Sequence, residues 1–280
     1  QLTSVQEAAL DTIQDHRDLR ISSQTGSGKT VALGLVMAPE IVNFVKSGDF
    51  NPRKSQGPNA LIIAPTRELA AQVQKELSWL FARVRGVKVE CVTGGTSVGQ
   101  ERQRLRHSPR IVVGTPGRLL DHIKSGALDC GGTTQLVMDE ADQMLDMGFR
   151  DELEAILDTL TAERRTHLIS ATFPREVLKL AETYQTNPLH VQGTTLGEAN
   201  ADIEHIAHLI HPRDRQAALI NILLLAEEQR TLVFVQTRAE ASQLAESLSS
   251  AGFAAAAISG DLVQSQRTRT LNAFRKGSIT

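Results

Sequence analysis

Residues 19–30 hold the pattern that most constrains the fold of this chain: an apolar segment, a glycine-rich loop and the start of a helix. The segment 19–22 is predicted to be a strand, and the loop after it reads Ser23-Gln24-Thr25-Gly26-Ser27-Gly28-Lys29-Thr30. This loop matches a phosphate-binding loop at every position except the first, where serine replaces glycine. Glycines and small residues let backbone N–H groups curl around a phosphate, towards which the next helix points its N-terminus.

Two side chains at the end of this loop would complete a nucleotide site. Lys29 would reach the β- and γ-phosphates, and the hydroxyl of Thr30 would complete the shell of a Mg²⁺ ion. The alternative is a glycine-rich turn that arose by chance. The order of strand, Gly-Lys-Thr and helix favours the nucleotide site.

A second predicted strand ends in a group of acids. An apolar run at 136–138 leads directly into Asp139 and Glu140, and Asp142 follows after one alanine. A continuous apolar run is typical of a strand that is buried on both faces of a parallel sheet, and ligands bind beyond the carboxyl ends of such strands. Asp139 could hold Mg²⁺, and Glu140 could orient and deprotonate a water. The alternative is a solvated acidic turn, which is the simpler interpretation of an isolated Asp-Glu pair.

Strands and helices alternate through the remainder of the first 192 residues. The predicted strands are the segments 60–64, 87–93, 110–114 and 167–169. Residues 67–80 and 153–160 carry apolar side chains at helical spacing. This alternation predicts an α/β fold with a mainly parallel, doubly wound sheet.

The chain divides at a small, polar and weakly patterned stretch, 193–202, which is predicted to be a linker. Beyond it the α/β alternation restarts, with predicted strands at 203–210, 232–235 and 254–258 and predicted helices at 215–227, 239–250 and around 264–267. A length of 280 residues suits two domains. We therefore expect an N-terminal domain at 1–192 and a second α/β domain at 203–280.

Composition restricts the classes of ligand. With 30 basic and 32 acidic residues, the net charge of −2 gives no support to a nucleic-acid partner, although a basic patch can be local. Aromatic residues make up only 4% of the chain, so any nucleic acid is expected to be held by its backbone rather than by stacked bases. The two cysteines form no Cys-x-x-Cys pair and no apolar run is long enough for a membrane span, which predicts a reduced, cytoplasmic compartment.

Taken together, the phosphate loop and the acids place the chain among known proteins: it closely resembles the DEAD-box RNA helicases of superfamily 2. Nine elements carry the resemblance, in the family's order: Gln6, Ser23–Thr30, Pro65–Ala70, Gly94-Gly95, Thr115–Arg118, Asp139–Asp142, Ser170–Thr172, Leu232–Arg238, and Gly260-Asp261 with Gln264 and Arg267. A single Asp-Glu-Ala-Asp string is a weak signal, whereas nine ordered elements are a strong one. The resemblance implies two RecA-like domains that close together on ATP and single-stranded RNA.

The resemblance also implies roles at the nucleotide site. Gln6 matches the glutamine that reads the adenine edge, although alone it would be interpreted as an exposed residue at a helix start. Lys29 would act with the rest of the loop on the phosphates of ATP, and Thr30 and Asp139 would hold Mg²⁺. Glu140 would be the general base that activates the attacking water.

Further residues match positions that couple ATP to RNA or contact RNA. The coupling residues would be Asp142, Ser170 and Thr172, although a Ser-Ala-Thr triplet alone would favour a helix N-cap. The RNA-binding positions would be Thr66, Arg67, Gly94, Gly95, Thr115, Gly117 and Arg118, and, in the second domain, Thr237, Arg238, Gly260, Asp261, Gln264 and Arg267. For Arg67 or Arg118 alone, a surface ion pair is the simpler interpretation.

The chain departs from the family pattern after Thr280, where the family continues into an Ala-Thr-Asp motif and into His-Arg-Ile-Gly-Arg-Thr-Gly-Arg, which supplies arginine fingers. The resemblance implies that the sequence stops within the second RecA-like domain. Since an arginine finger is worth ~10³–10⁵ in rate, we expect residues 1–280 to bind Mg·ATP weakly and to hydrolyse it poorly.

The predicted function is that of an RNA-dependent ATPase and helicase, with ATP and Mg²⁺ as cofactors, which binds RNA without sequence preference and unwinds short duplexes locally. Two alternatives stay open. One is a non-enzymatic RNA clamp or scaffold that ATP switches, and the other is a DNA helicase of the same superfamily.

Overall fold

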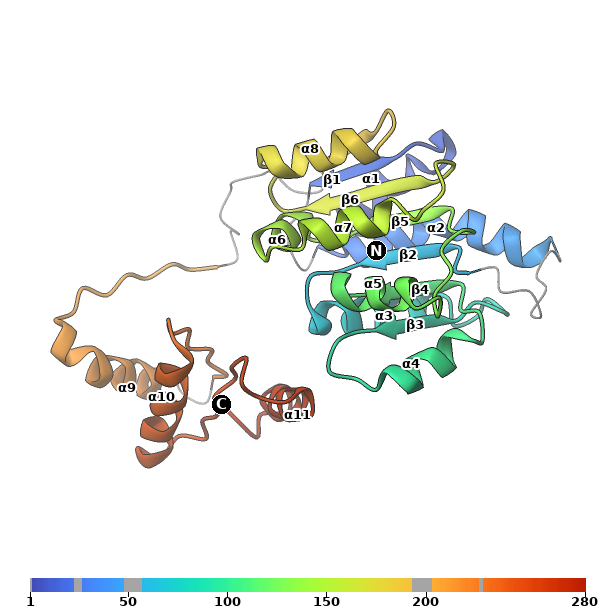
Figure 1. Cartoon of the computed structure of the whole chain (residues 1–280). Coiled ribbons are helices and arrows are strands. Elements are labelled where there is room, and N and C mark those ends of the chain that lie inside the picture. Colours follow the sequence, from blue (N-terminus) through green and yellow to red (C-terminus); the bar gives the residue numbers. More distant parts are fainter. Residues whose placement is uncertain (1, 23–26, 48–56, 193–202, 227–228) are drawn as a thin grey trace. The chain divides into compact units, whose positions relative to one another are not determined.

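The computed structural model of the chain describes residues 2–22, 27–47, 57–192, 203–226 and 229–280 (Figure 1). The chain folds into two compact units, Gln1–Glu198 and Ala199–Thr280. The predicted linker at 193–202 lies outside the described residues. Within the described segments, no helix has both the length and the apolar character needed to cross a lipid bilayer.

The first unit is built on one sheet of seven parallel strands. The strands are β1 (Leu19–Ser22), β2 (Ala60–Ile63), β3 (Val89–Val92), β4 (Ile111–Gly114), β5 (Gln135–Met138), β6 (Arg165–Ser170) and β7 (Leu189–Gln192). They lie side by side in the order β3-β4-β2-β5-β6-β1-β7. The predicted α/β class and doubly wound parallel sheet are confirmed.

Continuous apolar runs form the centre of this sheet. β2, β4 and β5 are buried along their whole length, and the register pairs Ile62 of β2 with Val113 and Val137. The edge strand β7 was not predicted, because it places only Val191 fully inside and leaves His190 exposed. A short strand with one buried residue carries little hydrophobic pattern.

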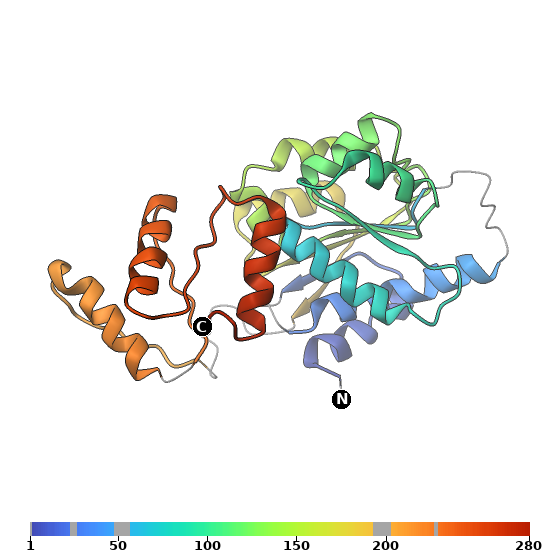
Figure 2. The same ribbon diagram turned by 90° about the horizontal axis from the view of Figure 1, so that it is seen from below.

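Helices cover both faces of the sheet (Figure 2). They are α1 (Ser4–Leu10), α2 (Lys29–Lys46), α3 (Arg67–Leu80), α4 (Val98–Leu105), α5 (Pro116–Lys124), α6 (Ala141–Asp146), α7 (Arg150–Leu157) and α8 (Arg175–Tyr184), with a 3₁₀ turn η1 (Ile13–Asp15). Successive strand residues point to opposite faces. Ile62 therefore packs in the core beneath α1, α2 and α3, and its neighbours Leu61 and Ile63 pack in the core beneath α4 to α8.

The strand order sorts the predicted functional segments along one edge of the sheet. Because all strands are parallel, their carboxyl ends meet at the same edge. The predicted RNA segments follow β3, β4 and β2, which are adjacent to one another. The predicted nucleotide and coupling segments follow β5, β6 and β1, which are also adjacent. The border between the two groups lies between β2 and β5.

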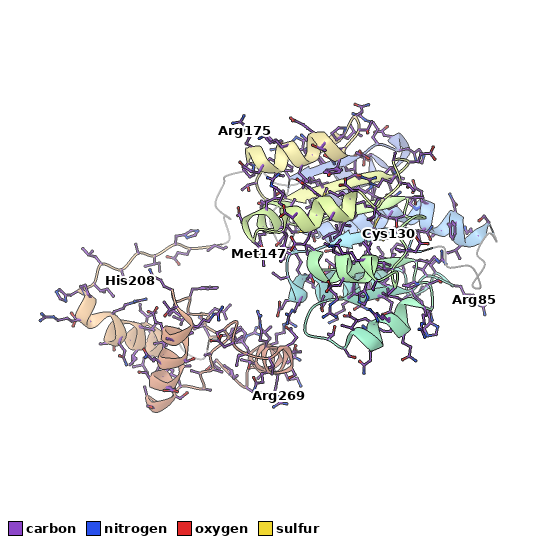
Figure 3. All side chains as sticks on the ribbon, viewed as in Figure 1. Arg85, Cys130, Met147, Arg175, His208 and Arg269 are labelled. Carbon is purple, nitrogen blue, oxygen red and sulfur yellow. The ribbon has the colours of Figure 1, made fainter. Side chains whose placement is uncertain are left out.

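The second unit contains helices α9 (Arg215–Leu225), α10 (Arg238–Ser250) and α11 (Gln264–Arg275), and a 3₁₀ turn η2 (Pro212–Asp214). No strand forms among the described residues of this unit, so the strands predicted at 203–210, 232–235 and 254–258 are corrected. The segment 203–210 is extended and exposed throughout, and His208 projects from it into solvent (Figure 3).

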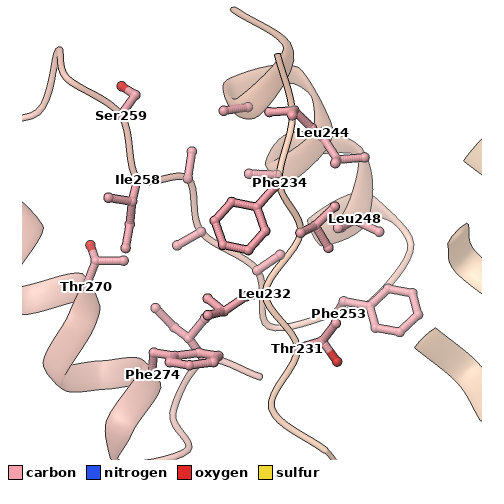
Figure 4. A pocket seen from close by; sticks show the side chains of 18 of the residues that line it. Thr231, Leu232, Phe234, Leu244, Leu248, Phe253, Ile258, Ser259, Thr270 and Phe274 are labelled. Carbon is pink, nitrogen blue, oxygen red and sulfur yellow. The ribbon is translucent and has the colours of Figure 1, made fainter. Parts of the chain in front are cut away.

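The other two segments predicted to be strands line an apolar cavity. The segments 232–235 and 254–258 line opposite sides of an apolar cavity of about 500 Å³ instead of pairing (Figure 4). At one end of it the backbone of Thr280 contacts both sides: the N–H of Thr231 donates to its carbonyl at 2.7 Å, and its own N–H donates to the carbonyl of Ala254 at 3.1 Å. A strand requires a hydrogen-bonded ladder, and among the described residues these segments form none with each other.

Candidate functional site

The N-terminus of α2 carries the described part of the predicted phosphate loop. Gly28 precedes the helix with φ of 86°, a left-handed conformation that favours glycine. Lys29 and Thr30 begin the helix and are buried, with exposed fractions of 7% and 9%. The positive end of the helix dipole therefore lies beside a lysine. The loop residues Ser23, Gln24, Thr25 and Gly26 lie outside the described residues.

Gln6 ties the start of α1 to this loop. Its Nε2 donates to the carbonyl of Gly28 at 3.2 Å, and its Oε1 accepts from the backbone N–H of Thr3 at 3.1 Å in a capping box. The hydroxyl of Thr3 donates to the carbonyl of Ser27 at 2.8 Å. Space here is tight, because a Cβ built at Gly28 would lie 2.5 Å from Nε2 of Gln6. Gln6 is therefore hydrogen-bonded directly to the end of the phosphate loop.

Asp139 and Glu140 lie at the carboxyl end of β5. Asp139 follows the strand and is 3% exposed, and its backbone N–H donates to the carbonyl of Ile63 at 2.9 Å. Glu140 is the N-cap of α6 and has φ of 54°, a left-handed conformation that is uncommon for a residue with a side chain. Such strain is concentrated at functional sites.

Both carboxyl groups have raised pKa values. Burial raises the pKa of Asp139 to about 6, against the opposing effect of nearby Lys29, and the charge of Glu140 adds to the rise. Burial also raises the pKa of Glu140, again opposed by Lys29, and Asp142 adds to the rise. A carboxylate that is costly to keep charged without a cation is suited to holding one, and a carboxylate with a raised pKa is a better proton acceptor.

The donor set at this site fits Mg²⁺. Oδ1 of Asp139 is buried and has no hydrogen-bond partner among the described residues. Over the same residues, no group of three or more His, Cys, Asp or Glu side chains could hold a metal. Mg²⁺ typically takes one or two protein carboxylates and completes its shell with waters and substrate phosphates. Asp139 and the Thr30 hydroxyl are the side chains that would hold it.

Asp142 connects β5 to the end of β6. Its Oδ2 accepts from the hydroxyl of Thr172 at 2.6 Å and from the Thr172 N–H at 3.0 Å, and its own N–H donates to Oγ of Ser170 at 3.2 Å. Burial would raise the pKa of Asp142, but the hydrogen bonds from Thr172 and Ser170 outweigh it and lower that pKa. The structure thus brings the three predicted coupling residues together in one network. The helix that follows them, α8, has Pro174 as its N-cap, so the Ser-Ala-Thr triplet does not cap it.

The predicted RNA-binding residues of the first unit form a second group around the carboxyl ends of β2, β3 and β4. Thr66 is the N-cap of α3, and its hydroxyl accepts from the Leu69 N–H at 3.2 Å. The guanidinium of Arg67, the next residue, lies against Gly94. Gly95 follows with φ of 82°. Small residues here allow a ligand to approach the backbone closely.

The first turn of α5 completes this group. Thr115 is its N-cap and Pro116 its first residue, and a Cβ built at Gly117 would meet no atom within 4 Å. Arg118, which the resemblance places among the RNA-binding residues, has a side chain that is only 12% exposed, and its Nη1 lies 2.6 Å from Oε2 of Glu101 in an ion pair. Sequence reasoning missed Glu101, because a single acid on a short, charged helix carries no motif.

In the second unit the predicted RNA-binding residues lie at the starts of α10 and α11. Thr237 caps α10 by accepting from the Glu240 N–H at 3.1 Å. Arg238 lies 2.6 Å from Asp261 in an exposed ion pair, and its guanidinium lies against Gly260. The remaining two residues, Gln264 and Arg267, are in the first turn of α11.

Two family models match the chain. The model described as DEAD/DEAH box helicase matches residues 3–180, and the model described as helicase conserved C-terminal domain matches residues 214–280. The ATP-dependent RNA helicase DbpA of Bacillus subtilis is 36% identical over 98% of this chain and 55% of its own length. The protein named ATP-dependent RNA helicase DbpA in Escherichia coli is 36% identical over 99% of this chain and 58% of its own length.

A solved structure agrees with these matches. The crystal structure of a DEAD box protein from the hyperthermophile Methanococcus jannaschii aligns with a TM-score of 0.60 and 34% identity, covering 99% of this chain and 72% of that chain. The chain spans about half the length of the curated relatives it matches.

Proposed function

The chain belongs to the DEAD/DEAH box helicase family, and we propose on that basis that it binds ATP and single-stranded RNA and couples ATP hydrolysis to local separation of short RNA duplexes. The observation that carries the proposal is the placement of Asp139 and Glu140 at the carboxyl end of β5, within electrostatic reach of Lys29 at the N-terminus of α2. A phosphate-binding element beside a buried acid pair is the arrangement that nucleoside triphosphate hydrolysis requires.

We assign ATP binding and hydrolysis to the residues that follow β1 and β5, together with Gln6. Residues 23–30 surround the phosphates, Lys29 neutralises their charge and Gln6 contacts the adenine. Thr30 and Asp139 hold Mg²⁺, which, when bound, draws negative charge from the phosphate oxygens. Glu140 accepts a proton from the attacking water, and its raised pKa supports that role. The network of Asp142, Ser170 and Thr172 passes the state of this site towards the RNA group.

We assign RNA binding to the backbone-rich loops around Thr66, Gly94 and Thr115 in the first unit and to the starts of α10 and α11 in the second. Contacts to phosphates and sugars position a strand without reading its sequence, and the sparse aromatic residues support a grip that ignores sequence. We propose the domain limits 1–192 and 203–280, joined by 193–202. A cytoplasmic location is proposed from the two cysteines, which are both free.

Binding measurements test this proposal most directly. Fluorescence anisotropy would follow a labelled ten-nucleotide oligouridine with ATP, with ADP and with neither, in Mg²⁺ and after chelation. We expect tighter RNA binding with ATP and Mg²⁺, and competition by RNA better than by the matched DNA, because the 2′-OH distinguishes them. RNA binding that ATP does not change would contradict the coupled function. Equal competition by DNA would favour a DNA helicase.

A further inference from the structure

A buried carboxylate joins two loops of the proposed RNA-binding group. Glu101 lies in the first turn of α4 and is 0% exposed. Its Oε1 accepts from the backbone N–H of Thr93 at 3.0 Å and from the hydroxyl of Thr96. Its Oε2 accepts from Nη1 of Arg118 at 2.6 Å and from Nε2 of His122 at 2.8 Å. One oxygen thus serves the loop after β3, and the other serves α5.

The two partner segments bracket the residues proposed to meet RNA. Thr93 and Thr96 flank the glycine pair at 94–95, so the carboxylate is hydrogen-bonded on both sides of this pair. Arg118 ends the Thr-Pro-Gly-Arg turn. Arg118 Nη1 also donates to the carbonyl of Thr96 at 3.4 Å, so the arginine contacts both the carboxylate and the glycine loop.

The network is built to keep Glu101 charged. Burial would raise the pKa of Glu101, but the hydrogen bonds from Thr96, His122, Thr93 and Arg118 outweigh burial and lower it. A buried carboxylate that receives several donors is strongly oriented, because removing any donor leaves an unsatisfied charge. Its position therefore fixes the distance between the two loops more firmly than packing between small residues would.

We propose that Glu101 is a positioning residue for RNA binding, which holds the glycine loop at 93–96 and the first turn of α5 in the single arrangement that an RNA backbone meets. The inference rests on the proposed function. We call Glu101 and its four hydrogen-bond donors the Glu101 brace. Arg118 belongs to this brace, because its guanidinium forms an ion pair with Glu101 and its side chain is largely buried. The RNA-facing groups are then the backbone N–H groups and small side chains around Gly95 and Gly117.

Removing the negative charge of Glu101 tests this proposal, because electrostatics alone and a positioning role predict opposite changes in RNA affinity. Glu101→Gln deletes one negative charge inside a site for a polyanion, which by electrostatics alone would leave RNA affinity unchanged or raise it. If Glu101 positions the loops, the affinity for a labelled ten-nucleotide oligouridine falls instead, about tenfold, because backbone N–H contacts to phosphates are lost. The matched control is Glu163→Gln, which removes the same charge at an exposed site and keeps wild-type RNA affinity. Unchanged or tighter binding by Glu101→Gln overturns the proposal.

A second pair of variants covers the case in which Glu101→Gln does not fold, and separates this proposal from the proposed function. Thr96→Val removes one donor at an exposed position and should weaken RNA binding about threefold in a folded protein. A double-mutant cycle of Thr96→Val with Arg118→Gln, read from the unfolding equilibrium, should show coupling of about fivefold. If the wild type bound no RNA, the proposed function would fail. Coupling between Thr96 and Arg118 in the unfolding equilibrium would still show that Glu101 joins the two loops. Additive effects on unfolding would show that Glu101 does not join the two loops.

Discussion

The guanidinium of Arg67 lies against Gly94 so closely that a Cβ built at this glycine would come 3.1 Å from Nη2 of the arginine. Arg67 begins α3 after β2, and Gly94 follows β3, so the contact joins the ends of two strands that β4 separates. A glycine is needed here for close approach rather than for an unusual φ. The arginine thereby lies beside Gly94 at the proposed RNA surface.

Gly94→Ala should therefore weaken RNA binding with little effect on folding. The added methyl group displaces the flexible end of Arg67 rather than backbone, so we expect the free energy of unfolding to change by less than about 1 kcal/mol. RNA affinity should fall roughly 3- to 10-fold, measured by anisotropy. Gly117→Ala is the comparison, because its Cβ meets no atom within 4 Å in the protein. A smaller loss of RNA affinity in Gly94→Ala than in Gly117→Ala would contradict this explanation. It would show that glycine is needed for the approach of RNA and not for the contact with Arg67.

The same relationship recurs in the second unit, between Arg238 and Gly260. A Cβ at Gly260 would lie 3.4 Å from Nη2 of Arg238. Thr66 and Thr237, which precede the two arginines, have the same backbone angles, φ −125° and ψ 156°, and both cap a helix through the hydroxyl. The two units therefore share a local arrangement, in which a threonine caps a helix and the next residue, an arginine, lies beside a glycine. The sequence alone does not make this arrangement apparent, because a Thr-Arg pair and a distant glycine form no recognisable pattern.

Replacement of Glu140 tests the assignment of the general base. Glu140→Gln keeps the size of the side chain and its role as N-cap of α6 but removes its ability to accept a proton. We expect ATP turnover to fall roughly 10²–10⁴-fold, while ATP binding is kept and ATP-dependent RNA binding becomes longer-lived. Single-turnover hydrolysis with labelled ATP would measure this loss.

The matched control is Asp146→Asn, which removes an exposed acid from the same helix. It should hydrolyse ATP as the wild type does. Unchanged turnover in Glu140→Gln would contradict the catalytic role and favour the ATP-switched clamp.

The parts of the structure that could be predicted are those where a residue pattern is compatible with only one local structure. The buried run 60–63 has no polar alternation, so it fits only a strand covered on both faces. The residues Lys29 and Asp139 were found because phosphate and metal chemistry demands particular residue types at strand ends. Their convergence in space follows from the parallel sheet.

The parts that could not be predicted depend on tertiary contacts between residues with no motif. Glu101 is an ordinary acid in sequence and becomes informative only when its four donors are seen together. The sequence also could not reveal that Arg118 faces inwards, although an ion pair was one open interpretation. In the second unit the apolar runs at 232–235 and 254–258 have strand composition, yet they line a cavity and form no strand among the described residues, because a strand also requires a hydrogen-bonded partner.

A buried histidine should make the first unit sensitive to acid. Burial, with a contribution from the charge of Arg165, lowers the pKa of His167 to about 3. Nδ1 of His167 accepts from the Leu19 N–H at 3.2 Å, so the ring is neutral and its Nε2–H donates to Gln135 at 2.9 Å. The unfolded chain, with a histidine pKa of about 6.5, binds the proton first. Stability is therefore lost as pH falls below about 6.5, by about 2 kcal/mol at pH 5.

His167→Asn tests this expectation, because the asparagine oxygen can still accept from Leu19 and has no proton to bind. The variant should be less stable at pH 7, through the lost contact with Gln135, but its free energy of unfolding should fall less between pH 7 and pH 5. Urea unfolding at several pH values would measure the difference. His107→Asn, at an exposed site, should keep the wild-type pH slope. Equal slopes for wild type and His167→Asn would show that another group carries the acid sensitivity.

Hydrogen exchange should separate the paired strands of the first unit from the unpaired segments of the second. Among the described residues, the amides of 232–235 make no backbone hydrogen bond, and Phe234 is 89% exposed, whereas β2 is fully buried and bonded on both sides. We expect the amides of 232–235 to exchange within seconds and those of β2 to be protected far longer, because exchange follows the stability of local hydrogen bonding. The amides of α10 provide the internal control, since their protection would show that the second unit is folded while its apolar segments remain open. Protection of 232–235 equal to that of β2 would instead mean that these segments pair as strands in solution, and that the cavity between them is closed.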